Sequence, residues 1–254
     1  MKFGGTLIGI HESLNPILIK EYSDTFELLV TELTIGSKDI RLISGYGPQD
    51  CWKIEDRMPF FTALEEEISK AEISGKSIVI SFDANSKLGP DWIPKDPHEQ
   101  SPNGQILAGV LERHALFVAN GDKEKCQGTI TRRRTTVDGE EISAIDFVIL
   151  SHDMVGDFVS LQVDEAQKYS LTSVARTKKG TKCKESDHNS LITKFKIKYD
   201  PHIKKHRTEI FIFKDSRGQT TFKDKTSNTA KLSSIIENTI DINNATKKFI
   251  KKTF

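Results

Sequence analysis

The sequence predicts a layered α/β domain in which β-sheets pack together and helices lie outside them. Three observations indicate this class: strand-like runs dominate the first 200 residues, helix-like segments separate some of them, and no internal repeat is present. With 254 residues, of which 36% are hydrophobic and 29% charged, the chain is long enough for one such domain and some poorly folded sequence.

The first half of the chain supplies a hairpin, a helix and a strand. Residues 26–48 predict two strands joined at residues 36–39, where Gly-Ser-Lys-Asp is a hairpin signal. Residues 57–73 carry apolar side chains at helical spacing with acidic residues between them. The run KSIVISF at 76–82 then predicts a buried strand, because it is rich in β-branched residues.

The second half predicts one more helix and further strands. Residues 103–121 begin at Asn103, a plausible helix cap, and predict a helix that continues into a short strand. Four strand-like segments follow, at residues 128–134, 142–151, 154–163 and 186–199. A charged loop is expected after the first of them, at 135–141, and a polar, basic loop before the last, at 168–185.

The charge distribution predicts a boundary near residue 200. The net charge is +1, but residues 201–254 carry twelve Lys and Arg against five Asp and Glu. The first 200 residues are therefore acidic. We expect a folded domain over residues 1–199 and a basic, weakly ordered extension over residues 200–254, whose Asn and Thr content makes it a poor helix former.

Composition also indicates an intracellular protein, nuclear or cytoplasmic. No apolar run approaches the roughly 18 residues of a membrane span, and the first residues have no signal-peptide pattern. The three cysteines are far apart and odd in number, which favours a reducing compartment over a disulfide framework. We therefore expect no membrane partner.

Four motifs place polar side chains at the ends of apolar strands. They are SGYGPQ, SFDANSKLG, SAIDFVILS and ESDHNSLI, and together they supply Tyr46, Asp83, Asn85, Asp146, Asp187 and His188. Taken alone, Asp83 and Asn85 are explained by a turn, since both residue types are common there. The set as a whole matches the needs of phosphodiester hydrolysis: carboxylates to hold Mg²⁺, and a histidine beside a carboxylate to oppose developing charge.

In this order and spacing, the four motifs resemble those of the endonuclease/exonuclease/phosphatase superfamily. The resemblance covers roughly residues 4–198. Within the superfamily, the motifs are similar to those of the endonuclease domains of LINE-type retrotransposons, which precede a reverse transcriptase. It implies a four-layer α/β/β/α sandwich of the DNase I-like type and a metal-dependent endonuclease that acts on DNA. No Tyr/Phe-x-Asp-Asp polymerase motif follows, so the chain itself carries no polymerase.

The resemblance also implies roles for the site residues. Asp83 would orient or deprotonate the attacking water, while Asn85 and Tyr46 would contact the phosphate. His188 would stabilise the transition state with Asp146 as its partner. Asp187, with Asp83, would lie close to the metal, which is Mg²⁺ or Mn²⁺ because both suit oxygen ligands.

The chain departs from the superfamily pattern at its start. The strand that ends in a metal-binding Glu does not appear, and Phe82 stands where the family usually has Gly. The chain therefore looks N-terminally truncated by about sixty to eighty residues, with its first strands missing. We expect weak metal binding and low activity as a result, because carboxylate count strongly affects affinity.

Basic segments predict a surface for the DNA phosphate backbone, although such runs are more often solvated faces. The candidate contacts are Arg132, Arg133, Lys178 and Lys179. Two alternatives remain open at this stage. The chain is either an inactive remnant that at most binds nucleic acid, or a phosphatase of the same superfamily that acts on a small molecule or lipid headgroup.

Overall fold

The computed structural model describes residues 6–11, 14, 16–22, 26–137, 139–169, 172–177 and 180–198. For residues 172–177 and 180–185 it describes the backbone alone. The predicted extension at 200–254 and the candidate DNA contacts Lys178 and Lys179 lie outside these residues, so the domain boundary near residue 200 stays a prediction.

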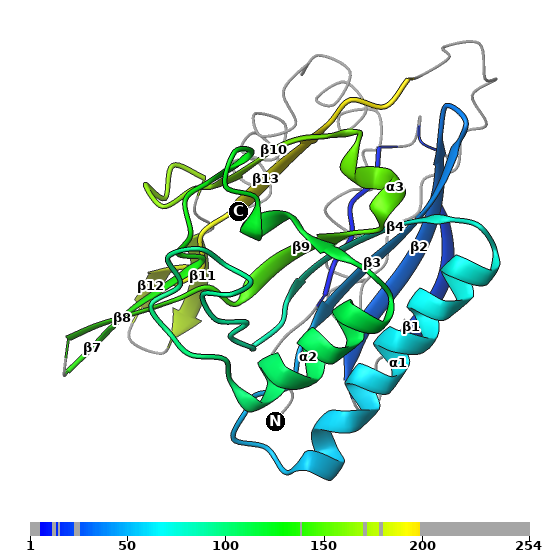
Figure 1. Cartoon of the computed structure of the whole chain (residues 1–254). Coiled ribbons are helices and arrows are strands. Elements are labelled where there is room, and N and C mark those ends of the chain that lie inside the picture. The colour runs from blue at the N-terminus through cyan, green and yellow to red at the C-terminus, as the bar shows by residue number, and fades with distance from the viewer. Residues whose placement is uncertain are drawn as a thin grey trace. The chain divides into compact units, whose positions relative to one another are not determined.

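The central element is a mixed six-stranded sheet with the strand order β1-β2-β3-β4-β9-β5 (Figure 1). Strands β3 and β4 are parallel, while the other neighbours in this sheet are antiparallel. The strands are β1 (Ile17–Tyr22), β2 (Glu27–Ile35), β3 (Lys38–Tyr46), β4 (Ser77–Asp83), β5 (Phe117–Val118) and β9 (Asp146–Leu150). The predicted hairpin is confirmed as β2–β3, and Gly36 in its turn takes a left-handed φ of 62°, which glycine adopts readily.

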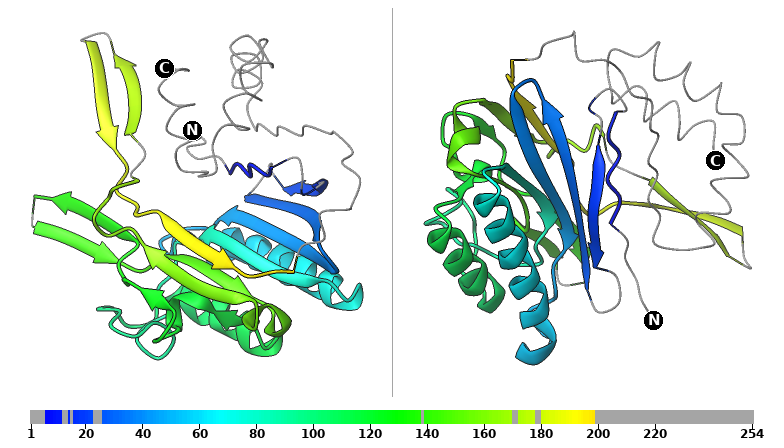
Figure 2. Two further views of the ribbon diagram at one scale, coloured as in Figure 1. Left: turned by 90° about the horizontal axis from the view of Figure 1, so that it is seen from above. Right: turned by 90° about the vertical axis from the view of Figure 1, so that its right-hand side faces the viewer.

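Two helices cover one face of this sheet, and a second sheet covers the other. Helices α1 (Ile54–Ile73) and α2 (Pro102–Arg113) lie on the same side, as the edge-on view in Figure 2 shows. The second sheet has the order β13-β10-β6, with β6 (Cys126–Gln127), β10 (Phe158–Val163) and β13 (Leu191–Phe195). A short helix, α3 (His152–Val155), connects β9 to β10. The predicted α/β class with packed sheets is confirmed. The described residues form three layers of the expected four-layer α/β/β/α sandwich, namely α/β/β, and no second layer of long helices lies among them.

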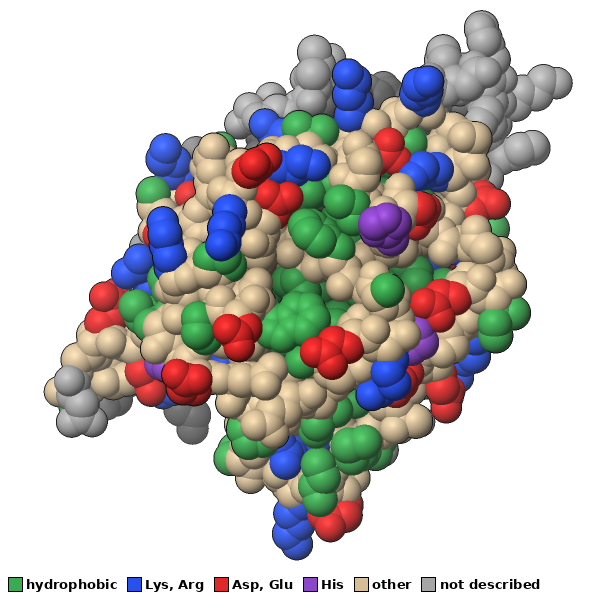
Figure 3. Space-filling model, in the orientation of Figure 1, with side chains coloured by type: hydrophobic (Ala, Val, Ile, Leu, Met, Phe, Trp, Pro, Cys, Tyr) green, Lys and Arg blue, Asp and Glu red, His purple; other side chains and the backbone are tan. Residues whose placement is uncertain are grey.

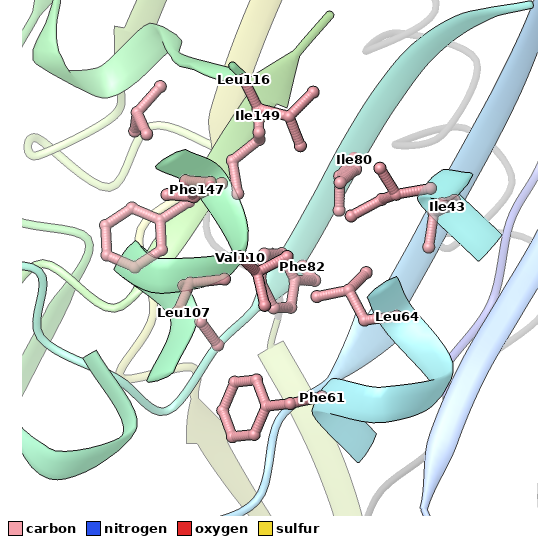
Figure 4. Close-up of a cluster of buried hydrophobic side chains, with 14 of the residues drawn as sticks. Ile43, Phe61, Leu64, Ile80, Phe82, Leu107, Val110, Leu116, Phe147 and Ile149 are labelled. Carbon is pink, nitrogen blue, oxygen red and sulfur yellow. The ribbon is translucent and has the colours of Figure 1, made fainter. Parts of the chain in front are cut away.

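Two hydrophobic clusters hold these layers together. The larger lies between the helices and the central sheet, where Leu64 and Phe61 of α1 and Val110 of α2 meet Phe82 and Phe147 (Figure 4). The smaller lies between the two sheets and includes Val148, Phe158 and Leu161. Strand side chains alternate between the two faces, so each central strand contributes to both clusters.

Two further hairpins extend the fold. Strand β7 (Arg132–Thr136) pairs with β8 (Gly139–Ser143), and β11 (Thr172–Thr177) pairs with β12 (Gly180–Glu185). The prediction of a loop over residues 168–185 was therefore wrong. A polar segment can still form strands when its backbone groups are satisfied by pairing, and polarity alone had suggested a loop.

Smaller differences have local causes. The strand predicted at 142–151 is divided at Ala144-Ile145, because β8 ends in one hairpin and β9 begins in the central sheet. The N-cap of α2 is Ser101 and not Asn103: the Ser101 hydroxyl accepts a hydrogen bond from the Gly104 amide, and Pro102 suits the first helical position. No helix of the described residues is long and apolar enough to cross a membrane.

Truncation of the central core should unfold the domain readily. Phe147 is fully buried between the helices and the sheet, so Phe147→Ala removes a ring and leaves a cavity. We expect a loss of about 3–5 kcal/mol in the free energy of unfolding, measured by urea denaturation. Val137→Ala is the control: this side chain is fully exposed, and its loss should change stability by less than about 0.5 kcal/mol. Equal effects of the two substitutions would contradict the assigned core.

Candidate active site

Three of the predicted site residues lie in one row across three neighbouring strands. Tyr46 is paired with Asp83 in the parallel β3–β4 ladder, and Asp83 is paired with Asp146 in the antiparallel β4–β9 ladder. Tyr46 and Asp83 are the last residues of their strands, and Asp146 is the first of its own. Paired residues of adjacent strands point to the same side, so their side chains share one space.

The alternation of β4 decides which side that is. Ile78, Ile80 and Phe82 face the helices, whereas Val79 faces the second sheet. Asp83 has the parity of Val79 and therefore lies on the inter-sheet side, at the point where the apolar contacts between the sheets end. Its side chain is only 13% exposed and that of Asp146 16% exposed, so both carboxylates are largely withdrawn from water.

His188 reaches this pair from the segment before β13. Its Nδ1 lies 3.0 and 3.1 Å from the two carboxylate oxygens of Asp146, and its Nε2 lies 3.8 Å from Oδ2 of Asp83. Folding therefore brings His188 close to Asp83, although the two residues are 105 positions apart in the sequence. The predicted partnership of His188 with Asp146 agrees with this geometry.

The turn after β4 lies close to the segment that follows β3, and hydrogen bonds join the two. Oδ1 of Asp83 accepts a hydrogen bond from the Asn85 amide at 2.9 Å, and Nδ2 of Asn85 donates to the Gly47 carbonyl at 2.8 Å. Asn85 has a left-handed φ of 45°, a conformation that Asn tolerates better than most residues. The Gly47 amide in turn donates to the Asp83 carbonyl at 2.7 Å. The segments after β3 and β4 are thus tied together beside Tyr46.

Burial and mutual repulsion set the charge states. Burial, followed by the nearby charge of Asp146, raises the pKa of Asp83 to about 6. For His188, burial works to lower the pKa, but the hydrogen bond that its ring donates to Asp146 and the negative charges of Asp146 and Asp83 outweigh burial, so the pKa is raised. The arrangement therefore favours an imidazolium at His188 and a carboxyl group at Asp83 that titrates near neutral pH.

Several supporting residues carried no predicted role. The hydroxyl of Thr131 accepts hydrogen bonds from the amides of Ile145 and Asp146 at 2.9 and 3.0 Å. Asn120 donates to the Asp146 carbonyl and accepts from the Val148 amide. Both side chains are buried and fix the start of β9. The only sequence signal was a polar residue at the edge of an apolar run, which is too common to identify them.

Asp187 directly precedes His188 in the chain but has a different partner. Its Oδ2 accepts a hydrogen bond from Nε of Arg132 at 3.2 Å. Burial raises the pKa of Asp187, but backbone hydrogen bonding and the Arg132 guanidinium more than compensate, so the pKa is lowered overall. The structure joins Asp83 with Asp146 and His188, and Asp187 with Arg132. A metal contact of Asp187 stays a prediction.

The candidate DNA contact Arg133 has its charge compensated by neighbouring carboxylates. Arg133 lies within 4 Å of two carboxylates, at 3.4 Å from Glu140 and 3.7 Å from Glu165. Arg134 is exposed on the β7–β8 hairpin.

Buried Asn103 holds the segment after Tyr46: its Nδ2 donates to the Pro48 carbonyl, and its Oδ1 accepts from Arg57.

The carboxylate pair fits a hard divalent cation. Ligand atoms of Asp83, Asp146 and His188 all lie within 4.8 Å of one another. His188 is occupied by Asp146 and favoured as an imidazolium, which cannot ligate a metal, so the two carboxylates are the suitable donors. The raised pKa of Asp83 points the same way, because two close carboxylates without a cation repel each other.

A hollow of about 340 Å³ lies elsewhere, between α2 and the loop from Leu88 to Gln100. None of the candidate site residues lines it. Figure 3 shows the face that carries α1 and α2, where acidic, basic and hydrophobic side chains are interspersed. This face presents no continuous basic surface to a polyanion.

Comparison with known proteins gave matches among solved structures. No protein-family model matches the chain, and neither does any curated protein. The endonuclease domain of TRAS1, a telomere-specific non-LTR retrotransposon, is 20% identical over 72% of this chain and 70% of that one, with a TM-score of 0.46. A 3′-5′ exonuclease, NExo, from Neisseria meningitidis is 17% identical over 66% and 65%, with a TM-score of 0.47.

A third match is an endonuclease/exonuclease/phosphatase family protein from Bacteroides thetaiotaomicron. It is 11% identical over 76% of this chain and 75% of that one, with a TM-score of 0.42. Its name is that of the superfamily that the four motifs resemble.

The contact between the two segments can be tested at Gly47. A Cβ atom there would lie 2.2 Å from the Ala84 carbonyl oxygen, so Gly47→Ala must push the segments after β3 and β4 apart. We expect a loss of about 1–3 kcal/mol in the free energy of unfolding, measured by urea denaturation. Gly156→Ala is the matched control, because its Cβ would meet nothing within 4 Å and its backbone is helical. A Gly47→Ala variant as stable as the control would contradict this packing.

Asp83 and Asp187 lie in opposite charge environments, so replacing each with Asn should change the stability of the fold in opposite directions. Asp83→Asn should stabilise the metal-free protein by roughly 1–3 kcal/mol at pH 8, because the folded state no longer ionises a buried carboxyl group. The folded pKa of Asp83 lies above its unfolded value, so this gain appears as pH rises from about 4 through about 6 and is absent in acid.

Asp187→Asn is the counterpart in the same measurement. Its folded pKa is lowered, so its carboxylate stabilises the fold above the unfolded pKa and the substitution should destabilise at pH 8. That loss should disappear as pH falls through the lowered pKa. Thermal unfolding of both variants and the parent in EDTA, from pH 3.5 to 8, checks both signs. A destabilising Asp83→Asn at pH 8 would contradict the assigned repulsion.

Proposed function

We propose that this protein is a metal-dependent phosphodiester hydrolase that cleaves DNA as an endonuclease and derives from a retrotransposon polyprotein. One observation carries the proposal: Tyr46, Asp83 and Asp146 share one row of the sheet, and His188 is fixed against Asp146 with its second nitrogen toward Asp83. This is the set of groups that attack on a phosphodiester requires, gathered at one withdrawn site.

Asp83 is the base in this proposal. Its carboxylate is largely buried, keeps one oxygen on the Asn85 amide and directs the other toward the shared space beside His188. In the metal-free protein, burial and the nearby Asp146 raise the pKa of Asp83 to about 6, which makes this carboxylate a better proton acceptor than an exposed Asp. Asp83 therefore holds the attacking water and receives its proton.

His188 opposes the negative charge that develops on the phosphate oxygens. Asp146 stabilises its imidazolium form and fixes the plane of the ring. A preorganised cation that needs no rearrangement during the reaction is an effective source of transition-state stabilisation. Asp146 acts through His188 and positions it.

Asn85 and Tyr46 bind the phosphate. One N–H of the Asn85 carboxamide is held by the Gly47 carbonyl, which leaves the group oriented with its second N–H available. The Tyr46 hydroxyl makes no hydrogen bond within the described residues and lies beside Asp83 in the row. Asp83 and Asp146 would hold Mg²⁺ or Mn²⁺, which when bound supplies positive charge next to the phosphate and lowers the pKa of water.

DNA is the proposed substrate because basic side chains border the site. Arg132 lies beside Asp187, and Arg133 follows it on the same strand. Such contacts bind the phosphate backbone without reading sequence. Cys51 and Cys126 are unpaired, which supports an intracellular setting.

Nicking of supercoiled plasmid tests the proposal. The purified chain should convert supercoiled to open-circular DNA with Mg²⁺ or Mn²⁺ and should stop in EDTA. Asp83→Ala and His188→Ala should each lower the rate by about 10²–10⁴-fold, since each removes a group that acts in the chemical step. Arg113→Gln, a surface substitution on α2 away from the site, is the control and should leave the rate unchanged.

The outcomes separate the alternatives. DNA binding without metal-dependent cleavage by the folded chain would favour an inactive nucleic-acid-binding remnant. Release of phosphate from a small phosphomonoester in preference to DNA cleavage would favour the phosphatase. Metal-independent nicking that survives both substitutions would reject this site as its origin.

A further inference from the structure

Arg132 lies in the wall of the candidate active site, a position that a role as one of several contacts to the DNA backbone does not explain. It is the first residue of β7, and its backbone forms an isolated antiparallel bridge with His188. The residue before it, Thr131, carries the hydroxyl that fixes the amide of Asp146. Arg132 therefore follows Thr131, which holds the start of β9, and its backbone is bridged to that of His188.

The side chain of Arg132 is oriented but only partly used. Its Nε donates to Oδ2 of Asp187 at 3.2 Å, and the side chain is 26% exposed. Its two terminal amino groups make no hydrogen bond within the described residues, and neither is a buried unpaired atom. The guanidinium is thus held through Nε, while its two terminal amino groups are available to bind a ligand.

The anchor of Arg132 is also next to the reacting groups. Asp187, which holds its guanidinium, is the residue before His188, and Nε2 of His188 lies 3.8 Å from Oδ2 of Asp83. Arg132 is therefore held beside the histidine of the site.

We propose that Arg132 binds the phosphate group that reacts, through its two terminal amino groups, while Asp187 positions the guanidinium through Nε. The inference rests on the proposed function and deepens it: Arg132 acts at the reacting phosphate and is not one of several contacts along the DNA backbone. The planar fork of Arg matches two phosphate oxygens, which the ammonium of Lys cannot do.

The neighbouring arginines show why Arg132 differs from a general basic surface. Arg133 is engaged by Glu140 and Glu165, so its charge is compensated within the hairpin. Arg134 is on the same strand with the same parity as Arg132, but it is exposed and two residues farther from His188. Arg134 is therefore a matched control of equal charge.

A ligand with a single phosphodiester distinguishes the two roles. We suggest the dinucleoside monophosphate of thymidine in EDTA, with binding by the full chain followed by the His188 ring-proton resonances, which are assigned by their absence in His188→Ala. This ligand has no neighbouring phosphates, so a residue that binds only distant parts of the DNA backbone cannot affect its affinity. Because no cleavage is needed, binding is measured independently of catalysis.

The expected results are specific to the guanidinium. Arg132→Gln should weaken binding at least tenfold, Arg132→Lys should weaken it by an intermediate factor, and Arg134→Gln should stay within twofold of the parent. Asp187→Asn should also weaken binding, because the guanidinium loses its orienting partner. Thermal unfolding of each variant shows whether the fold is kept, and the Lys variant preserves the charge if Gln disturbs it.

Three outcomes of the binding experiment would overturn the inference: unchanged affinity in Arg132→Gln, an equal loss in Arg134→Gln, or no binding of the ligand by the parent protein. The proposed function fails differently, by an absence of metal-dependent plasmid nicking. Binding that depends on Arg132 without nicking would keep a phosphodiester site and remove the hydrolase. Nicking that does not depend on Arg132 would keep the hydrolase and remove this role.

Discussion

The register of β4 between β3 and β9 is the constraint on which the candidate site depends. It places Tyr46, Asp83 and Asp146 side by side, although 63 positions of the chain separate the two carboxylates in the printed numbering. A slip of one residue would turn Asp83 toward the helices and bury it among Phe82 and its neighbours. The apolar residues of β4 on both faces exclude that slip, so the hydrophobic core fixes the geometry of the polar site.

This geometry has an electrostatic cost in the metal-free protein. Asp83 and Asp146 are both withdrawn from water and close enough for the charge of one to raise the pKa of the other. The imidazolium of His188 offsets only part of that repulsion, because it is hydrogen-bonded to Asp146 and lies 3.8 Å from Asp83. The site is therefore a local source of instability that a bound cation would relieve, as expected where function and stability compete.

A buried polar framework keeps the site in place. Thr131 and Asn120 satisfy backbone groups at the start of β9, and Gly47 allows the segments after β3 and β4 to approach closely. Most of the predicted elements are present, but this framework was not predicted. A threonine or asparagine at a strand edge has the same local appearance whether it supports a site or simply faces water. The hairpin at 172–185 was missed for a related reason, since backbone pairing does not require an apolar pattern.

The sequence by itself determined the α/β class, the central hairpin, the main helices and the strand-end positions of Tyr46, Asp83 and Asp146, because hydrophobic periodicity and turn residues are local properties of the chain. It also indicated His188 as the partner of Asp146, through motif resemblance. Only the tertiary structure decided that Asp187 pairs with Arg132, that Ser101 caps α2, and that Asp83 titrates near pH 6. These properties depend on burial and on charges brought close by folding, which no local pattern encodes.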